Sequence, residues 1–307
     1  MSVVFWKELA DHFSSRRFMI LLIIIVLSAL WATYASGQAI RQNSETVPAH
    51  YAFLLLLTSS GETVFSLATF LGFFGPLVGI VLGFDAISGE YANGTLSRVL
   101  SQPIYRDDLI NGKFLAGLAT VAILWSSILL LVVGLGITLL GFPPNGEELW
   151  RMLIFTAVGV CYLGFWLALA MLFSLLFQKT VTAALASMAV WLFMILFMPV
   201  ISQALAVAIV PDASTPELIA RQANILDLLG RFSPTLLYSE SVRVLLDPTE
   251  RVIGVALQSQ AEGLLATPLA LGQSLNLIWP HIITLFGLVI VCFGISYIVF
   301  MRAEIRA

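Results

Sequence analysis

"FDAISGEYANGTLSRVLSQPIYRDDLINGKF", residues 84–114, is a polar stretch that separates two long apolar runs. It holds four acidic residues and a proline, whereas the runs beside it, 64–84 and 114–140, carry almost no charge. A helix of about 20 apolar residues crosses a hydrocarbon core about 30 Å thick, and both runs reach that length. The sequence therefore predicts a loop that leaves a membrane after one span and returns to it with the next.

The composition of the whole chain favours an integral membrane protein. Of the 307 residues, 59% are hydrophobic and 11% are charged, and the mean hydropathy is +0.97. Soluble domains are about one quarter charged. A net charge of −3 with no basic cluster gives no indication of nucleic-acid binding. The two cysteines, Cys161 and Cys292, both lie in apolar runs and are too few for a disulfide framework or a structural zinc site.

Six apolar runs predict an all-α polytopic protein with six spans: 18–36, 64–84, 114–140, 152–177, 181–210 and 282–301. The fifth run is overlong, and Pro199 should bend or end it, so that 200–210 lies at the surface or re-enters the membrane. Cytoplasmic loops are enriched in Lys and Arg. Both termini are therefore assigned to the cytoplasm, which places nine cations on short inner segments: Lys7, Arg16, Arg17, Arg98, Arg106, Lys113, Lys179, Arg302 and Arg306.

The segments outside the spans have their own patterns. Residues 1–17 predict an amphipathic interfacial helix, with Phe5 and Leu9 on the apolar side and Lys7 and Glu8 on the polar side; an unstructured basic leader is the alternative. The polar segment before the first apolar run is longer than that of a cleaved signal peptide, so we do not expect this run to be a cleaved signal. Residues 37–63 are expected to form an outer loop. Residues 211–281 are expected to form a small external helical cap with two helices, one ending near Gly230 and one over 233–247.

The sequence lacks the motifs of several nucleotide-binding and enzyme classes. The sequence contains no G-x-x-x-x-G-K-[ST], H-E-x-x-H or G-x-S-x-G, so we expect no ATP site, metalloprotease or hydrolase on this chain. No Asp, Glu, Lys, Arg or His lies near the middle of a predicted span, which argues against a proton-coupled carrier. The three histidines are interpreted as interfacial, and the methionines of the fourth and fifth spans as packing residues in preference to Cu(I) ligands. No metal site is predicted, and energy for transport would come from another polypeptide.

The second span carries glycines on one helical face: Gly72, Gly75, Gly79 and Gly83. Small residues at this spacing let another helix approach closely. The face is predicted either to pack within one subunit or to line a transport path or dimer seam.

The polar stretch itself predicts a short helix. Gly94 can break the preceding helical direction, and Thr95 can cap the next helix. Leu96, Val99 and Leu100 then share one side of about two turns, which Pro103 ends. A short helix with one apolar face suits docking into a groove of a partner protein. An ordinary solvated connector is the alternative.

The stretch also resembles the ABC-2 type permeases, the membrane subunits of ATP-binding-cassette transporters, and especially the branch that includes the permease of nitrous-oxide-reductase maturation. The resemblance lies in the ordered motif Asp85-Ala86-Ile87, Gly89-Glu90, Gly94-Thr95-Leu96, Gln102-Pro103, Arg106 and Gly112-Lys113-Phe114. The six-span layout, the N-terminal helix and the ending "FMRAEIRA" extend it over nearly the whole chain, 1–307, as one transmembrane domain.

This resemblance implies that the cytoplasmic loop 85–113 carries the coupling helix, which binds a separate ATPase subunit holding ATP and Mg²⁺. The resemblance implies a homodimer in preference to a heterodimer. It also implies a location in the cell membrane of a bacterium or archaeon, where the protein contacts lipid. The implied contact residues are Glu90, Gly94, Thr95, Leu96, Arg98, Val99, Leu100, Pro103 and Arg106.

Three functions are compatible with these features. The leading one is the permease subunit of an ABC exporter that is not itself an enzyme. The others are a self-sufficient channel or secondary carrier, and a membrane scaffold for an assembly factor. The resemblance raises a sulfur- or copper-related cargo, but the sequence contains no thiol or histidine cluster that would bind one. A lipid, a drug and a hydrophobic peptide also fit apolar spans.

Overall fold

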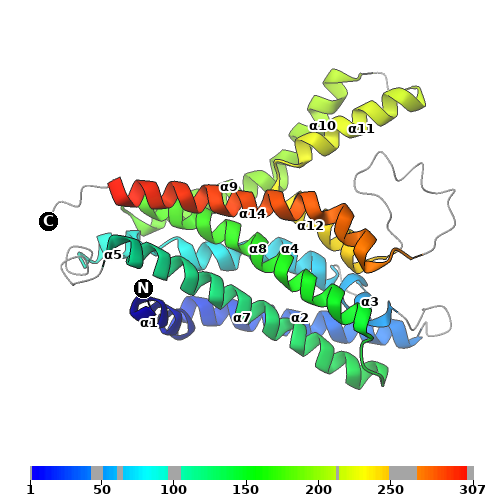
Figure 1. The fold of residues 1–307 in the computed structure, drawn as a ribbon, viewed down its shortest axis with the longest axis horizontal. Helices are drawn as coiled ribbons and strands as arrows, with labels where there is room; N and C mark the ends of the chain where they lie inside the picture. Colours follow the sequence, from blue (N-terminus) through cyan, green and yellow to red (C-terminus); the bar gives the residue numbers. More distant parts are fainter. Residues whose placement is uncertain are drawn as a thin grey trace.

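Every regular element of the described chain is a helix. The computed structural model describes residues 2–42, 51–60, 65–95, 105–211, 214–248 and 268–302. The helices form an elongated bundle (Figure 1), and the polytopic all-α fold expected from the sequence is confirmed. One end carries α1 (Ser2–Ser14), α5 (Ser88–Ala92) and the end of α14, and is called the α1 end. The opposite end carries α3 (Ala52–Thr58) and is called the α3 end.

Within the part of the chain that the structure describes, five helices are long and apolar enough to cross a membrane. They are α2 (Arg16–Gln42), α7 (Arg106–Leu140), α8 (Gly146–Leu176), the continuous segment Thr180–Ile209, and α14 (Leu271–Arg302). The second predicted span forms α4 (Leu67–Gly83), whose 17 residues rise about 26 Å at 1.5 Å per residue. This helix is at least ten residues shorter than the five long helices and packs inside the bundle against α8.

The fifth run bends where the proline predicts. It consists of α9 (Thr180–Leu192), a π-helical turn (Phe193–Phe197) and α10 (Met198–Ile209), with Pro199 in the first turn of α10. Pro199 lacks an N–H and disrupts the regular hydrogen-bond ladder at this point. Beyond the bend, α10 and α11 (Pro216–Gly230) pair with each other and project away from the bundle (Figure 1).

Two segments differ from the expected loops. Within 37–63, α2 continues to Gln42 and α3 is buried, with Phe53 and Leu54 fully inaccessible. The backbone N–H of Phe53 is bound by Glu148 Oε1 at 2.9 Å, a contact across 95 positions that no local pattern signals. Within 211–281, α12 (Pro234–Leu246) packs against α4, α8 and α14, so only α11 belongs to a projecting hairpin. Both helices expected in this segment are present, and their place outside the membrane stays a prediction.

The core of the bundle is the contact between α4 and α8. In the most apolar 18-residue stretch of α8, 61% of the residues are buried. In the corresponding stretches of the other four long helices, the buried share is 11% to 33%. A Cβ atom at Gly79 would lie 2.7 Å from the carbonyl oxygen of Leu163, and one at Gly83 would lie 2.7 Å from that of Leu167. The two backbones therefore touch, and only glycine fits on this side of α4.

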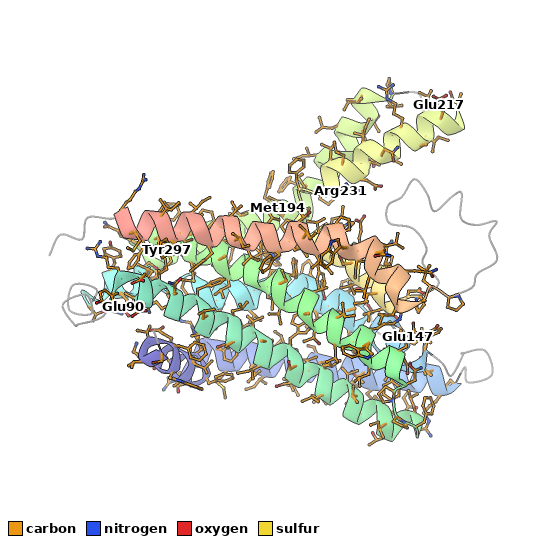
Figure 2. The ribbon with its side chains drawn as sticks, in the orientation of Figure 1. Glu90, Glu147, Met194, Glu217, Arg231 and Tyr297 are labelled. Atoms are coloured by element: carbon orange, nitrogen blue, oxygen red, sulfur yellow. The ribbon has the colours of Figure 1, made fainter. Side chains whose placement is uncertain are left out.

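Charged side chains occur at the two ends of the bundle and on the projecting hairpin. Figure 2 shows Glu90 at the α1 end and Glu147 at the α3 end, whereas Glu217 and Arg231 lie on the hairpin that contains α11. Between the two ends the surface of the long helices is largely apolar, with exposed residues such as Leu130, Ile290 and Val291. This distribution is typical of a bundle that spans a bilayer.

The α4–α8 contact can be tested by adding one methyl group. Gly79→Ala should lower the unfolding temperature in detergent, at a cost of about 1–3 kcal/mol, because the new methyl group meets a backbone carbonyl that cannot rotate away. Gly287→Ala in α14 is the matched control, since no heavy atom lies within 4 Å of its added Cβ. Equal melting curves for the two variants would show that close approach at Gly79 does not hold α4 against α8.

Candidate functional site

The polar stretch leaves the bundle at the α1 end through a turn that α8 holds in place. α4 ends at Gly83, and α5 begins at Ser88 after a short turn. The hydroxyl of Ser174 on α8 accepts hydrogen bonds from the backbone N–H groups of Ile87 (2.9 Å) and Ser88 (2.8 Å). Ser174 is completely buried. The unpaired N–H donors at the start of α5 are thereby satisfied by a side chain of another helix.

The end of α5 is also fixed. Gly94 has a φ of +66°, a left-handed conformation that glycine adopts without strain. The chain then turns back, so that the N–H of Thr95 donates to the carbonyl of Glu90 at 3.0 Å. The Thr95 hydroxyl donates to the Glu90 carboxylate. Thr95, the last described residue before residue 105, is thus held in a defined position.

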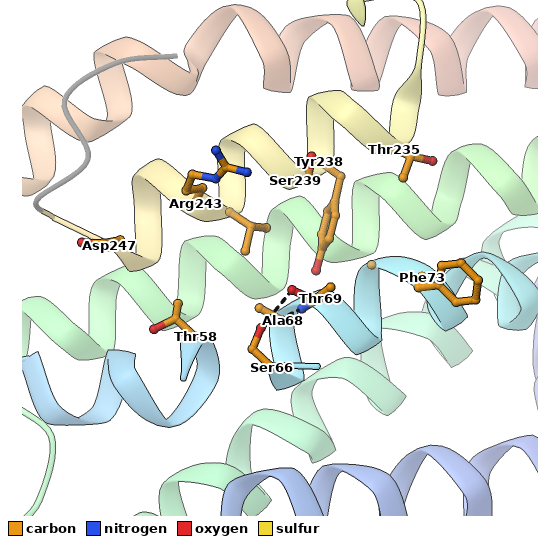
Figure 3. A pocket seen from close by; sticks show the side chains of 12 residues that line it. Thr58, Ser66, Ala68, Thr69, Phe73, Thr235, Tyr238, Ser239, Arg243 and Asp247 are labelled. Carbon is orange, nitrogen blue, oxygen red and sulfur yellow. Dashed lines mark hydrogen bonds between the residues drawn. The ribbon is translucent and has the colours of Figure 1, made fainter. Parts of the chain in front are cut away.

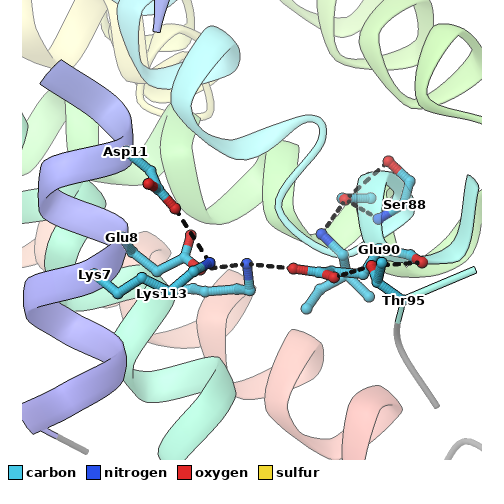
Figure 4. A network of polar contacts seen from close by, with 9 residues as sticks. Lys7, Glu8, Asp11, Ser88, Glu90, Thr95 and Lys113 are labelled. Carbon is cyan, nitrogen blue, oxygen red and sulfur yellow. Dashed lines mark hydrogen bonds and ion pairs between the residues drawn. The ribbon is translucent and has the colours of Figure 1, made fainter. Parts of the chain in front are cut away.

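A buried ammonium group connects three helices beneath this segment. Lys113 Nζ of α7 lies 2.9 Å from Glu8 Oε1 of α1 and 3.5 Å from Glu90 Oε1 of α5, and Lys113 is only 6% exposed (Figure 4). A Cβ atom at the neighbouring Gly112 would lie 2.8 Å from Val4, so α1 rests directly on α7. The cation and its two carboxylates place α1 and α5 at fixed positions on α7.

Glu8 stays ionised in this network. Burial alone would raise its pKa, but the ammonium groups of Lys113 and Lys7 outweigh burial and hold the pKa below its ordinary value of 4.5. Lys7 also pairs with Asp11 at 3.1 Å on the exposed side of α1. The amphipathic pattern assigned Glu8 to the solvated face of this helix. In the structure it points inward instead, and this assignment is corrected.

A second ion pair connects α2 to the turn after α4. Arg17 Nη1 lies 3.0 Å from Asp85 Oδ2, and the Arg17 guanidinium lies 5.4 Å from the centre of the Phe84 ring. Burial raises the pKa of Asp85, and the charges of Arg17 and Lys113 partly offset this effect. These groups and those around Lys113 line a cleft of about 260 Å³ between α1, α2 and α5.

The predicted contact residues fall into two groups. Glu90, Gly94 and Thr95 lie together at the end of α5, and Arg106 starts α7. The others lie outside the described residues: Leu96, Arg98, Val99, Leu100 and Pro103.

The glycines of α4 lie against other parts of the same chain. Gly75, Gly79 and Gly83 contact α8, and Gly72 contacts the ring of Tyr238 on α12. Among the described residues, no three His, Cys, Asp or Glu side chains are grouped as they would be around a metal ion.

Comparison with known proteins supplies the family. The sequence model of a family described as "ABC-2 family transporter protein" matches residues 2–305. The chain belongs to this family. Among its ABC-2 relatives is a protein named "Probable ABC transporter permease protein NosY" from Pseudomonas aeruginosa, which is 38% identical over 110 residues. A protein of the same name from Stutzerimonas stutzeri is 34% identical over 108 residues.

The two aligned regions are short. They cover 36% and 35% of this chain, and the chain spans about a third of the length of each relative, 35% in both cases. The match over 2–305 and the apolar helices establish a multi-pass membrane protein of the ABC-2 family.

Three buried polar groups of this ABC-2 protein could not be recognised from local sequence. Lys113 and Glu8 are 105 positions apart. Arg151, close to the start of an apolar run, is fully buried and donates to the carbonyls of Leu245 (2.8 Å) and Leu269 (2.6 Å). His281, interpreted as interfacial, is 3% exposed and lies 2.9 Å from Glu240. The available signal was only that Lys113 directly precedes an apolar run.

The Lys113 network should contribute measurably to stability. Lys113→Met should cost about 3–5 kcal/mol, because Glu90 loses its cation and Glu8 keeps only the exposed Lys7. Asp11→Asn is the matched control, since Asp11 pairs with Lys7 on the exposed side of α1 and should cost under about 1 kcal/mol. The measurement is thermal unfolding in detergent at neutral pH. A Lys113→Met protein as stable as Asp11→Asn would contradict the role assigned to the network.

The lowered pKa of Glu8 gives this network a pH dependence. The folded protein binds the Glu8 proton less readily than the unfolded chain, so the contribution is complete above pH 4.5 and is lost as the pH falls through the lower folded value. From about pH 5 to about pH 3 the unfolding temperature of the wild type should therefore fall more steeply than that of Glu8→Gln. Parallel curves would show that Glu8 is not the titrating group.

Proposed function

We propose that this chain is the permease subunit of an ABC exporter in the cell membrane of a bacterium or archaeon. A separate ATPase subunit binds ATP and Mg²⁺, and its hydrolysis of ATP drives cargo across the membrane through a pair of permease chains. Residues 1–307 act as one transmembrane domain, with no catalytic group of their own. Membership of the ABC-2 family supports this proposal, and the names of the two relatives agree with it.

The observation that carries the proposal is the anchoring of both sides of segment 96–104. Thr95 is bound to Glu90, and Glu90 to Lys113 of α7, the helix that starts at Arg106 on the other side of the segment. A force applied to the segment would therefore reach α7 and α1 directly. A solvated connector requires no such buried cation at its base, and burying one is costly unless it is paired.

A second route leads from α5 to the core of the bundle. The Ser174 hydroxyl ties the start of α5 to α8, and α8 touches α4 along the glycine face. Pressure on the coupling segment would thus tilt α4 and α8 as one unit. The glycine face packs within the subunit in this view, and the dimer seam is formed by other surfaces of a homodimer.

The proposal places the α1 end in the cytoplasm. This end carries Lys7, Arg16 and Arg17, together with Lys113 and the Lys179 turn between α8 and α9. Lys and Arg near the ends of spans favour the cytoplasmic side. An ATPase would then reach α5 and the segment that follows it from inside the cell.

The ATPase contact can be tested by co-purification. Leu96→Asp and Val99→Asp should each abolish retention of the ATPase on the tagged permease, because a carboxylate would be buried in an apolar groove. Leu228→Asp is the control, since Leu228 is a 61% exposed apolar residue on the projecting α11. Retention of the ATPase by both loop variants would overturn the assignment of the coupling segment.

Measurement of ATP hydrolysis in reconstituted vesicles distinguishes a permease from a scaffold. For the complex reconstituted in vesicles, a transported cargo should stimulate ATP hydrolysis, and the stimulation should be lost in Leu96→Asp. An ATPase that stays bound but responds to no cargo would favour the scaffold. Cargo movement by the chain without its ATPase would favour a channel or carrier.

A further inference from the structure

A second cleft lies at the opposite half of the bundle, between α4 and α12 and next to the end of α3. Its volume is about 410 Å³, within the range of small-molecule sites. Figure 3 shows Asp247 and Arg243 toward one end of the cleft, and Thr235 and Phe73 toward the other. Because α4 runs from the α3 end inward and α12 runs outward, the charged end faces the α3 end and the aromatic end lies deeper in the bundle.

The deep part of the cleft contains an unused hydrogen-bond donor. Tyr238 is 2% exposed, and its hydroxyl has no hydrogen-bond partner among the described residues. The ring cannot turn away, because it stacks on Tyr162 with 4.5 Å between ring centres and fills the space beside Gly72. Figure 3 shows the ring reaching from α12 toward Thr69 of α4. A buried hydroxyl without a partner costs about 1–3 kcal/mol, which an acceptor atom in the cleft would offset.

The other hydroxyls in the lining already have hydrogen-bond partners. Thr58 donates to the carbonyl of Leu54 and Ser239 to that of Leu236, whereas the hydroxyls of Ser66 and Thr69 bond to each other and that of Thr235 bonds to Tyr162. A further donor is Arg243, which makes no ion pair within the described part of the chain. Asp247, the carboxylate of the lining, takes part in another interaction. The free groups of this cleft are therefore donors, and one of them is cationic.

The cleft also has apolar lining residues. Phe73 and Val242 line the cleft together with Ala68. Phe73 also packs edge-to-face on Trp191 of α9, with 5.5 Å between ring centres.

The charged end of the cleft suits an anion. Guanidinium groups such as that of Arg243 bind carboxylates and phosphates through paired hydrogen bonds. An occupant would thus be held by its charge at the α3 end and by apolar contact deeper in the bundle.

We propose that the α4–α12 cleft binds an amphipathic anion. A carboxylate, phosphate or sulfonate head pairs with Arg243, an oxygen of the occupant accepts from Tyr238, and an apolar body lies on Phe73 and Val242. The site extends the proposed function, but binding requires neither the ATPase nor segment 96–104. Failure of this proposal therefore leaves the ATPase contact untouched, and the reverse also holds.

The test is calorimetric titration of the purified full-length chain in a non-ionic detergent with decyl phosphate. Decanol, decyltrimethylammonium and inorganic phosphate are the comparison probes. We expect decyl phosphate to bind and each comparison probe to bind at least about 10-fold more weakly, because each lacks the charge, its sign or the apolar body. Equal or tighter binding of any of the three would overturn the stated ligand class.

Two variants locate the site. Arg243→Gln should weaken decyl phosphate at least about 10-fold, as expected for a charged hydrogen-bond donor, whereas Arg221→Gln on the exposed face of α11 should leave binding unchanged. Tyr238→Phe should weaken binding about 2- to 10-fold without lowering the unfolding temperature, because the hydroxyl has no partner to lose. Wild-type affinity in Arg243→Gln, or a destabilised Tyr238→Phe, would contradict the proposal.

A membrane lipid and a water-borne amphiphile share this chemistry. Native mass spectrometry of the purified wild type and Arg243→Gln distinguishes them. An anionic phospholipid retained by the wild type and lost from the variant identifies a bilayer source. Decyl phosphate binding with no retained lipid identifies a water-borne ligand. Phospholipid retained equally by both proteins would show that Arg243 does not bind the headgroup and would contradict the site.

Discussion

The close approach of the α4 and α8 backbones is the constraint on which the rest of the structure depends. In hydrocarbon, apolar side chains gain little by leaving lipid for protein, so helices associate through van der Waals packing at short distance. Gly79 and Gly83 allow that distance, because any side chain there would meet the carbonyls of Leu163 or Leu167. This contact draws α8 into the interior, where α4, α7, α9, α12 and α14 all pack on it.

A central helix can position distant features only if its ends are connected to its neighbours, and α8 has polar groups at both ends. At the α1 end, Ser174 binds the start of α5. At the α3 end, Arg151 binds the carbonyl of Leu245 near the end of α12, and Glu148 binds the N–H of Phe53 at the start of α3. Each link satisfies a backbone group that would otherwise be left unpaired where a helix starts or ends. The candidate coupling region and the α4–α12 cleft are therefore positioned by the same helix.

The sequence predicted the long apolar helices well because apolar length is a local property. The bend at Pro199 and the ends of α12 near Ser233 and Asp247 were also predicted, since proline and capping residues act within a few positions. What could not be predicted depends on contacts between distant residues. The burial of α3 depends on Glu148, and the inward orientation of Glu8 depends on Lys113.

The assignment of membrane orientation from Lys and Arg positions is limited in the same way, because it does not separate solvated cations from buried ones. Lys113 and Arg151 both stand at the ends of apolar runs, where a solvated cation and a buried, paired cation have the same local sequence. Only the three-dimensional structure shows that one joins α1 and α5 and that the other closes the end of α12. A cation at the edge of a span can thus be structural even where its position also fits the orientation rule.

The bend in the fifth apolar run separates α9, which packs on α8 and α4, from α10, which packs mainly on α11. α9 borders the deep end of the cleft through the contact of Trp191 with Phe73, and the π-helical turn that follows directs α10 away from α4 and α12. α4 and α12 are both tied to α8, whereas α10 packs mainly on α11. Under the proposed function, a push on α5 moves α8 and both walls of the cleft together. The width of the cleft would then change little, and its exposure would be set by movement of α4, α8 and α12 relative to α9 and α10.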